Sequence, residues 1–125
     1  MDDKKKILLV EDDALILKML SEQLSHAGYE ISMAQDGEEG INKTHELAPD
    51  LIILDLTLPK IDGIEVLAKI KADPVTSNIK IFILSNNNQD ETIKRALKLG
   101  VDDYMIKVNF TPEEIVGKVD KVLKQ

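Results

Sequence analysis

Short apolar runs alternate with longer amphipathic segments along the whole chain. The apolar runs cover about residues 6–11, 30–34, 51–54, 80–84 and 103–106. Within the first amphipathic segment, Ile16, Leu20 and Leu24 recur at the spacing of one helix face. Short apolar strands that alternate with amphipathic helices are typical of repeated βα units. The pattern therefore predicts five strands, each followed by a helix.

Start and stop signals set the expected limits of the helices. The five helices are expected at about 14–27, from 36 to before Pro49, at 64–72, from 88 to Gly100, and from 111 onward. Glycine readily adopts the left-handed conformation found after helix C-termini, which suits Gly28 and Gly100. In a capping box, a polar residue at the helix start is followed three positions later by Glu. The pairs that fit this pattern are Asp36 with Glu39, Asn88 with Glu91, and Thr111 with Glu114.

Five right-handed βα units produce an α/β fold with helices on both faces of a parallel sheet. In such a doubly wound sheet the strand order reverses beside the first strand, and ligands bind in the crevice at that reversal. The 125 residues suit one domain over residues 1–125, with a core large enough to fold without covalent staples.

Composition excludes several classes of function. The chain contains no Cys, so disulfides, thiolate catalysis and zinc held by sulfur are excluded. Sixteen basic residues against 23 acidic ones give a formal net charge of -7, which repels the phosphates of nucleic acids. No apolar stretch approaches the length of a transmembrane helix. We therefore expect a cytoplasmic protein that binds neither nucleic acid directly nor a membrane.

Polar side chains stand at the ends of four of the five apolar runs. They are Glu11, Asp12 and Asp13 after the first run, Asp55 after the third, Ser85 after the fourth and Lys107 after the fifth. Because the carboxyl ends of parallel strands share one edge of a sheet, these side chains are expected to gather in the crevice. Crowded carboxylates raise one another's pKa unless a cation neutralises them. A partly hydrated site with only oxygen ligands suits Mg²⁺.

The same residues could support phosphoryl transfer to a carboxylate. Asp55 stands alone past the central strand and is the expected nucleophile, which would form an aspartyl phosphate. Glu11 and Asp12 form a pair better placed to hold the metal ion. Lys107 could pair with Asp55 before the reaction and with phosphate oxygens afterward, while Ser85 could donate a hydrogen bond to the same oxygens.

Five short motifs stand in order along the chain. They are Leu8-Leu9-Val10-Glu11-Asp12-Asp13; Asp55-Leu56-Thr57-Leu58-Pro59 with Asp62-Gly63; Phe82-Ile83-Leu84-Ser85; Gly100 with Asp102-Asp103-Tyr104; and Ile106-Lys107. Together they resemble the receiver domain of two-component response regulators, the CheY-like superfamily, over the whole chain. The resemblance implies a flavodoxin-like three-layer sandwich, with a parallel five-stranded sheet of order 2-1-3-4-5.

The resemblance also implies how phosphate and metal would be held. Asp55 would accept a phosphoryl group from a sensor histidine kinase or a histidine phosphotransfer protein. Asp12, Asp55 and the backbone carbonyl of Thr57 would bind Mg²⁺, with Mn²⁺ as a substitute. Glu11 would act on the metal through water.

A switching role follows from the same resemblance. Ser85 and Lys107 would contact the phosphoryl oxygens, and movement of the Ser85 hydroxyl would be linked to the rotamer of Tyr104. The fourth helix, fifth strand and fifth helix would form the surface that controls an output protein. The chain would be a signalling switch rather than an enzyme with a separate substrate, and a monomer that can dimerise on activation.

Some positions depart from the family pattern or tune it. Val108 stands where the family commonly has Pro in a cis peptide. A cis bond before Val costs about 2.5–4 kcal/mol, so a trans peptide is expected here. Asn86 stands where the family usually has Ala or Gly, and its bulk could narrow access to the phosphoacceptor. Thr57 and Asn87 flank the phosphate approach in the family and influence how long the phosphoryl group survives.

Other interpretations compete for these residues. Asp13 is better explained as the cap of the first helix. A flavodoxin-type FMN binder shares the fold, but three acids in the first loop would repel its phosphate. A haloacid-dehalogenase-type phosphatase needs a second acid where Thr57 stands. The serious rival is a receiver-like interaction module that is not phosphorylated. His26 and His45 are expected to be solvated and far from the site.

Overall fold

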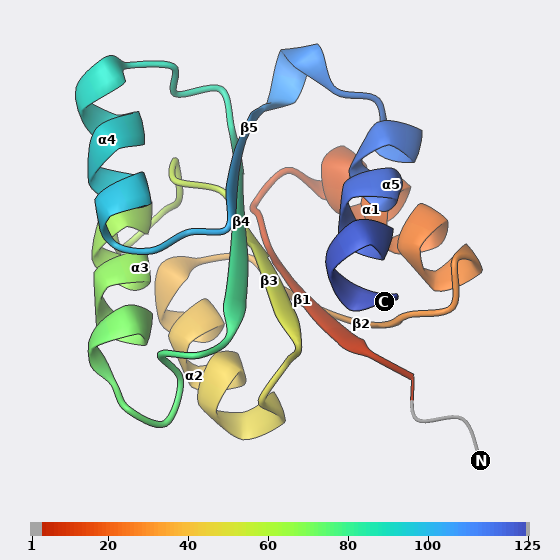
Figure 1. Cartoon of the computed structure of the whole chain (residues 1–125), viewed down its shortest axis with the longest axis horizontal. Helices are drawn as coiled ribbons and strands as arrows, with labels where there is room; N and C mark the ends of the chain where they lie inside the picture. Colours follow the sequence, from red (N-terminus) through yellow and green to blue (C-terminus); the bar gives the residue numbers. More distant parts are fainter. Residues whose placement is uncertain (1–3, 125) are drawn as a thin grey trace.

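A computed structural model describes residues 4–124 as a single parallel sheet with helices on both faces (Figure 1). The strands are β1 (Lys6–Val10), β2 (Glu30–Ala34), β3 (Leu51–Leu54), β4 (Lys80–Ser85) and β5 (Asp103–Ile106). The helices are α1 (Ala14–His26), α2 (Gly37–Leu47), α3 (Gly63–Ala72), α4 (Asp90–Lys98) and α5 (Pro112–Leu123), with a 3₁₀ turn, η1 (Lys107–Asn109), after β5. The strand order is β2-β1-β3-β4-β5. The predicted fold class and strand order are therefore confirmed.

The sheet separates two apolar cores. Helices α1 and α5 cover one face, and α2, α3 and α4 cover the other (Figure 1). Successive side chains of a strand point to opposite faces, so Ile7 and Leu9 of β1 join the α1/α5 core while Leu8 and Val10 join the other. Both faces of the central strands are buried, as expected for a parallel sheet.

Most predicted limits agree with the structure to within one or two residues, the usual uncertainty of helix and strand ends. The capping box that opens α5 is confirmed. Thr111 Oγ1 accepts a hydrogen bond from the Glu114 amide, and Glu114 Oε1 accepts one from the Thr111 amide. At α2, Asp36 caps the Glu39 amide as predicted, but the Glu39 carboxylate bonds the amide of Gln35 instead of that of Asp36.

The predicted capping box of α4, Asn88 with Glu91, is wrong. The N-cap residue is Gln89, which makes no side-chain capping bond, and the helix begins at Asp90. Asn87 Oδ1 accepts a hydrogen bond from the Gln89 amide at 3.0 Å, which forms a local turn at the place where Asn88 would begin the cap. The loop after β4 is therefore longer than the sequence pattern indicated.

The chain after β5 turns tightly through η1. Residues 4–124 contain no cis peptide bond, so Lys107 and Val108 are joined by a trans peptide as expected. Among the same residues, every helix is too short or too polar to cross a lipid bilayer.

Candidate functional site

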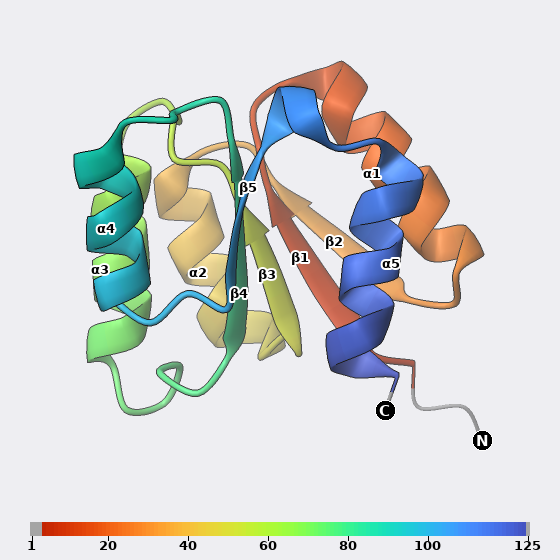
Figure 2. The ribbon, with the colours of Figure 1, turned by 45° about the horizontal axis from the view of Figure 1, so that its top comes forward.

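The loops after β1, β3, β4 and β5 lie along one edge of the sheet, at the top of Figure 2. Strand pairing sets their relative heights. Val10 is in register with Leu54, and the Asp55 amide continues this ladder by donating to the Val10 carbonyl at 2.9 Å. Glu11 and Asp55 therefore leave neighbouring strands at the same level, which is the convergence that the sequence predicted.

Three carboxylates converge at this edge. One carboxylate oxygen each of Glu11, Asp12 and Asp55 lies within 4.8 Å of the other two. Glu11 and Asp55 are each only 5% exposed, whereas Asp12 is exposed. Two buried acids beside a third accessible one need a neutralising charge, since a buried carboxylate is costly when it is not paired.

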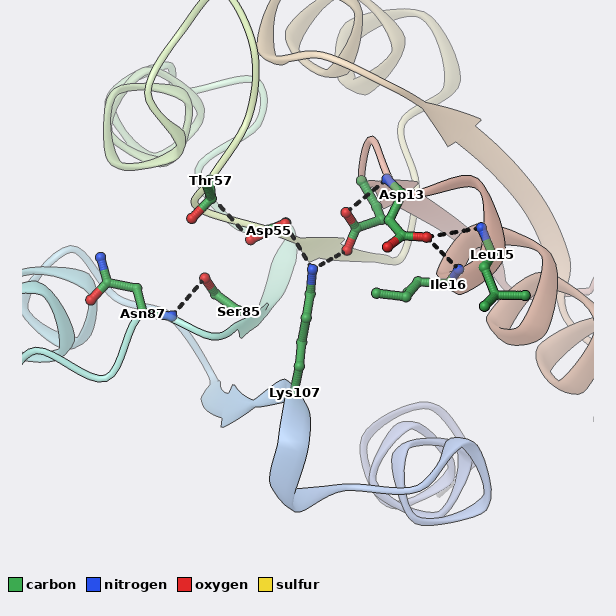
Figure 3. Close-up of polar contacts among 9 residues, drawn as sticks. Asp13, Leu15, Ile16, Asp55, Thr57, Ser85, Asn87 and Lys107 are labelled. Carbon is green, nitrogen blue, oxygen red and sulfur yellow. Dashed lines mark hydrogen bonds and ion pairs between the residues drawn. The ribbon is translucent and has the colours of Figure 1, made fainter.

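Lys107 supplies that charge in this structure. Its side chain extends from the end of β5 toward the acids (Figure 3), and its Nζ lies 2.6 Å from Oε1 of Glu11 and 2.9 Å from Oδ2 of Asp55. Burial raises the pKa of Glu11 above its ordinary value, against the lowering effect of the Lys107 hydrogen bond. Burial alone would lower the pKa of Lys107, but its bonds to Glu11 and Asp55 raise it. The pKa of Lys107 follows the ion pair, whereas the pKa of Glu11 follows burial, because one ammonium shared between two buried carboxylates does not outweigh the desolvation of Glu11.

Asp13 has a different task from its acidic neighbours. Its Oδ1 accepts hydrogen bonds from the amides of Leu15 at 2.9 Å and Ile16 at 3.2 Å, which caps α1 (Figure 3). Its own amide donates to Oε2 of Glu11 at 3.1 Å. The capping interpretation of Asp13 is confirmed, and the start of α1 also helps to orient Glu11.

Thr57 follows Asp55 in the same loop, and Ser85 is the last residue of the neighbouring strand β4 (Figure 3). Ser85 is fully buried at the end of β4, and its Oγ accepts a hydrogen bond from the Asn87 amide at 3.2 Å. The Thr57 amide donates to Oδ1 of Asp55 at 3.0 Å. Asp55 thus has one oxygen oriented by its own loop and the other paired with Lys107.

Tyr104 connects β5 to the loop after β4. Its hydroxyl donates to the backbone carbonyl of Asn87 at 2.7 Å. Burial, with a smaller effect of the nearby Asp55 charge, raises the pKa of the Tyr104 phenol. Through Asn87, the aromatic residue and Ser85 are held by the same short loop.

The donor set fits a hard divalent cation. The converging side chains offer only carboxylate oxygens, and one of them, Asp12, is open to water. Mg²⁺ and Mn²⁺ are held in proteins by such carboxylates together with water. The residues present are therefore compatible with the ion that the sequence implied.

One of the two histidines differs from the expectation. His45 is exposed but not simply solvated, because its Nε2 lies 2.7 Å from Oδ2 of Asp73 and its Nδ1 is 3.0 Å from the Ile41 carbonyl. His26 is exposed on α1, as expected. Asn86 is exposed beside the site.

The sequence pattern did not indicate an apolar cleft of about 180 Å³, which lies next to Lys107. Its lining residues are Ile16, Met19, Leu20, Leu84, Lys107, Phe110, Pro112 and Ile115. Leu15 and Val108 are large apolar side chains with 65% and 79% exposure in the adjoining segments. One sequence signal could have revealed this cleft. Leu15 and Met19 lie one helical turn apart and are apolar, although they do not belong to the stripe of α1 that is buried in the core.

Known proteins are similar to this chain in sequence and architecture. The family model of the response regulator receiver domain matches residues 7–120. The chemotaxis protein CheY of Thermotoga maritima is 36% identical over 122 residues, covering 96% of this chain and 98% of that protein. The chain spans about half the length of two curated transcriptional regulators, 48% of one and 49% of the other, each of them 38% identical to it.

Two similar response regulators have been solved in states that bear on the site. The Mn²⁺-bound form of response regulator Rcp1 matches with a TM-score of 0.83 and 29% identity, covering 94% of this chain and 93% of that one. The phosphorylated cyanobacterial phytochrome response regulator RcpA matches with a TM-score of 0.81 and 35% identity, covering 94% and 92%.

Proposed function

Because this chain belongs to the response regulator receiver domain family, we propose that it is a phosphorylation-dependent switch in which Asp55 accepts the phosphoryl group. The family is one of signalling receivers and not a classic enzyme family. The observation that carries the proposal is the pairing of buried Asp55 with Lys107 at 2.9 Å, beside Glu11 and Asp12. The 125 residues would form one such domain, which assists its own phosphorylation and dephosphorylation without a separate substrate.

In the proposed reaction, a carboxylate oxygen of Asp55 forms a bond to phosphorus while the bond from phosphorus to a donor histidine nitrogen breaks. The electron pair of the broken bond stays on the imidazole. Lys107 already lies within hydrogen-bond distance of Asp55, so it can follow the negative charge onto the phosphoryl oxygens. Ser85 Oγ accepts from Asn87, which leaves its own proton for donation to a phosphoryl oxygen.

Mg²⁺, with Mn²⁺ as a substitute, is the cation proposed for this site. Asp12, Asp55 and the backbone carbonyl of Thr57 would hold it, and Glu11 would act through a water molecule. When bound, the cation supplies positive charge against the negative charge of the transferring phosphoryl group. The oxygen-only donor set supports this choice, as does the Mn²⁺-bound state of a similar receiver.

The proposed switch couples the site to Tyr104. Phosphorylation replaces the single negative charge of the Asp55 carboxylate with a phosphoryl group that carries about -1.5 to -2, which favours a loop arrangement that brings the Ser85 hydroxyl toward phosphate. Ser85 and Tyr104 both bond to Asn87, so a shift of that loop changes the environment of the aromatic ring. The surface of α4, β5 and α5 would transmit the change to an output protein. A phosphate can only redistribute conformations that already exist, by its differential affinity for them.

Three positions would adjust the life of the phosphoryl group. Thr57 and Asn87 lie on the loops that border Asp55, and exposed Asn86 adjoins Ser85. Bulk and hydrogen-bonding capacity at these places would set how easily water and small donors reach the carboxylate.

We expect the donor to be a sensor histidine kinase or a histidine phosphotransfer protein in the cytoplasm. The apolar cleft beside Lys107 supports a protein donor, because it could receive apolar side chains while a phosphohistidine reaches Asp55. Large apolar side chains exposed at Leu15 and Val108 would add to the buried area. The receiver would act as a monomer that can dimerise on activation, with neither nucleic acid nor a membrane as a direct partner.

Intact mass measurement tests this proposal. The chain is incubated with Mg²⁺ and a small phosphodonor, and it should gain the mass of one phosphoryl group. Asp55→Asn should gain none, whereas Asp13→Asn should react like the parent, because Asn also caps helices well. An unmodified parent chain would favour the unphosphorylated interaction module. An adduct that persists in Asp55→Asn would place the acceptor elsewhere.

A further inference from the structure

The segment that carries Asp55 closes on itself eight residues later. After Asp55 the chain passes through an irregular stretch and returns at Gly63, the first residue of α3, whose amide donates to the Leu56 carbonyl at 3.0 Å. Lys60 within this loop has a φ of 71°, a left-handed conformation that is uncommon for residues with a side chain. The loop between Leu56 and Gly63 is therefore tight, and the contact between these two residues holds its ends together.

Gly63 is needed at this closure because of space. A Cβ atom added to Gly63 would overlap Leu56 Cα, and would lie 2.7 Å from the Leu56 carbonyl oxygen and 2.8 Å from its carbonyl carbon. All three atoms belong to the backbone, so no rotamer change can relieve the contact. Since carbon atoms in ordinary contact are about 3.5–4.0 Å apart, the two backbone segments would have to separate by roughly 1 Å.

Leu56 lies between the two residues that the site takes from this loop. Asp55 precedes it with its carboxylate in the acid cluster, and Thr57 follows it with its amide bonded to Asp55. The Leu56 side chain is buried in the same core as Ile64, so the start of α3 and the Asp55 loop are packed together. A displacement of the Leu56 backbone therefore moves both neighbours relative to Glu11 and Lys107, which belong to other strands.

We infer that Gly63 is a positioning residue, whose close approach to the Leu56 backbone sets where Asp55 and Thr57 present their oxygens to a divalent cation and a phosphoryl group. The part of this inference that concerns the cation and the phosphoryl group rests on the proposed function of Asp55. Its first part, the placement of the Asp55 loop by Gly63, applies to the metal-free chain as well.

The test compares Gly63→Ala with two controls. Gly117→Ala is the same substitution in α5, where an added Cβ would meet nothing within 4 Å. Leu24→Ala truncates a fully buried side chain, and the Leu24 carbonyl bonds Tyr29 next to the start of β2, at the opposite edge of the sheet from the acids. This second control destabilises the fold without touching the Asp55 loop.

Two measurements separate placement from stability. In the metal-free proteins, the amide resonances of Thr57 and Glu11 should shift in Gly63→Ala and stay unchanged in both controls. In a titration followed by the same amides, Gly63→Ala should bind Mg²⁺ about 10–100-fold more weakly, the range for losing the support of a metal ligand. Leu24→Ala should melt at a lower temperature yet keep the parent affinity.

Several results would overturn the inference. The first is a folded Gly63→Ala in which the amide resonances of Thr57 and Glu11 stay at their parent positions. The second is a loss of Mg²⁺ affinity in Leu24→Ala that equals the loss in Gly63→Ala. Should Gly63→Ala fail to fold, Asp62→Ala takes its place. This variant removes the 3.1 Å bond that fixes the Ile64 amide and adds no atom at the contact. It should shift the Thr57 amide and weaken Mg²⁺ binding several-fold, and parent-like behaviour there rejects the inference.

The outcomes for the proposed function remain distinct. A parent chain that takes no phosphoryl group would reject the role of Asp55 as acceptor, yet the amide shifts in metal-free Gly63→Ala would still support the placement by Gly63. Conversely, normal phosphorylation of the parent together with unchanged amides in Gly63→Ala would reject only the positioning role.

Discussion

The Nζ of Lys107 lies 2.9 Å from Oδ2 of Asp55, although 52 residues separate them in sequence. The same ammonium lies 2.6 Å from Glu11, so one cation stands between two buried carboxylates from neighbouring strands. One ammonium balances only one of the two carboxylates, so the acid cluster keeps a negative charge that a divalent cation can offset. A substitution of Lys107 or of either carboxylate should therefore alter both the folding stability and the binding of ligands at this site.

Lys107→Ala should destabilise the metal-free protein by up to about 3–5 kcal/mol, the cost of leaving a buried charge without its partner. Without the ammonium, nothing opposes the burial and the nearby Asp55 charge that raise the pKa of Glu11, so this pKa rises further. An acid whose folded-state pKa lies above its unfolded value loses stability as pH rises, so the deficit should be larger at pH 7.5 than at pH 5. Urea denaturation at both pH values measures it.

The matched control is Lys118→Ala, which removes an ion pair to Asp103 of similar length, 2.7 Å, but one-third exposed. Exposed pairs contribute about 0–1 kcal/mol, so this loss should be small at either pH. Equal losses in the two variants would contradict the special cost of the buried site.

A divalent cation should raise the melting temperature of the parent chain. Mg²⁺ at 100 times its dissociation constant stabilises a folded protein by about 2.7 kcal/mol when it does not bind the unfolded chain. Asp12→Asn should lose most of this increase, because Asp12 belongs to the acid cluster. Asp13→Asn should keep it, because Asp13 is occupied with the cap of α1. Calorimetry with and without MgCl₂ compares the three proteins, and a full Mg²⁺ response in Asp12→Asn would contradict its role as a ligand.

Tyr104→Phe should cost about 0.5–1.5 kcal/mol, the usual contribution of a neutral hydrogen bond. The substitution removes the donor to the Asn87 carbonyl and frees the loop that also holds Ser85. Hydrogen exchange of residues 86–89 should therefore accelerate, while the amides of β1 keep their protection. Tyr29→Phe is the control. It also removes a tyrosine hydroxyl that donates a hydrogen bond, but the acceptor is Asp120, at 2.5 Å, and not the loop after β4. Faster exchange of residues 86–89 in Tyr29→Phe would show that the effect is not local to Tyr104.

The His45 and Asp73 pair should give the protein a pH-dependent contact between α2 and the end of α3. The Asp73 hydrogen bond raises the pKa of His45, and the His45 hydrogen bond lowers that of Asp73. The contribution of His45 is therefore complete below its unfolded pKa of about 6.5 and is lost as pH rises through the folded value. The contribution of Asp73 to stability is lost as pH falls through the folded-state pKa of Asp73.

An NMR titration of the imidazole protons checks this prediction. Asp73→Asn should lower the pKa of His45, because it removes the carboxylate that raises it. A His45 titration that is insensitive to Asp73→Asn would mean that the pair does not form in solution.

Gly117→Ala should stabilise the protein by about 0.5–1 kcal/mol, the usual advantage of Ala over Gly inside a helix. The position is in the middle of α5, and an added Cβ meets no atom within 4 Å. Gly100→Ala should have the opposite effect, because Gly100 has a φ of 99°. Urea denaturation of both variants measures the two signs, and destabilisation by Gly117→Ala would reveal a contact that the structure lacks.

The sequence by itself determined the fold class, the strand order through its family resemblance, and the set of residues at the carboxyl edge. Apolar periodicity and caps such as Thr111 with Glu114 depend on residues close together in the chain, so they can be read locally. The edge residues followed from one rule, since the ends of parallel strands share a side. The individual roles of Asp55, Ser85 and Lys107 stay predictions.

Only the tertiary structure decided how these side chains divide their contacts. The sharing of Lys107 between Glu11 and Asp55, the bond from His45 to Asp73 and the closeness of Gly63 to Leu56 depend on angles and heights of elements that meet only in the folded chain. Asn88 illustrates the limit, because a competing bond from the neighbouring Asn87 displaced the expected cap. Local patterns report which conformations a segment favours, whereas distances between segments arise from the packing of the whole core.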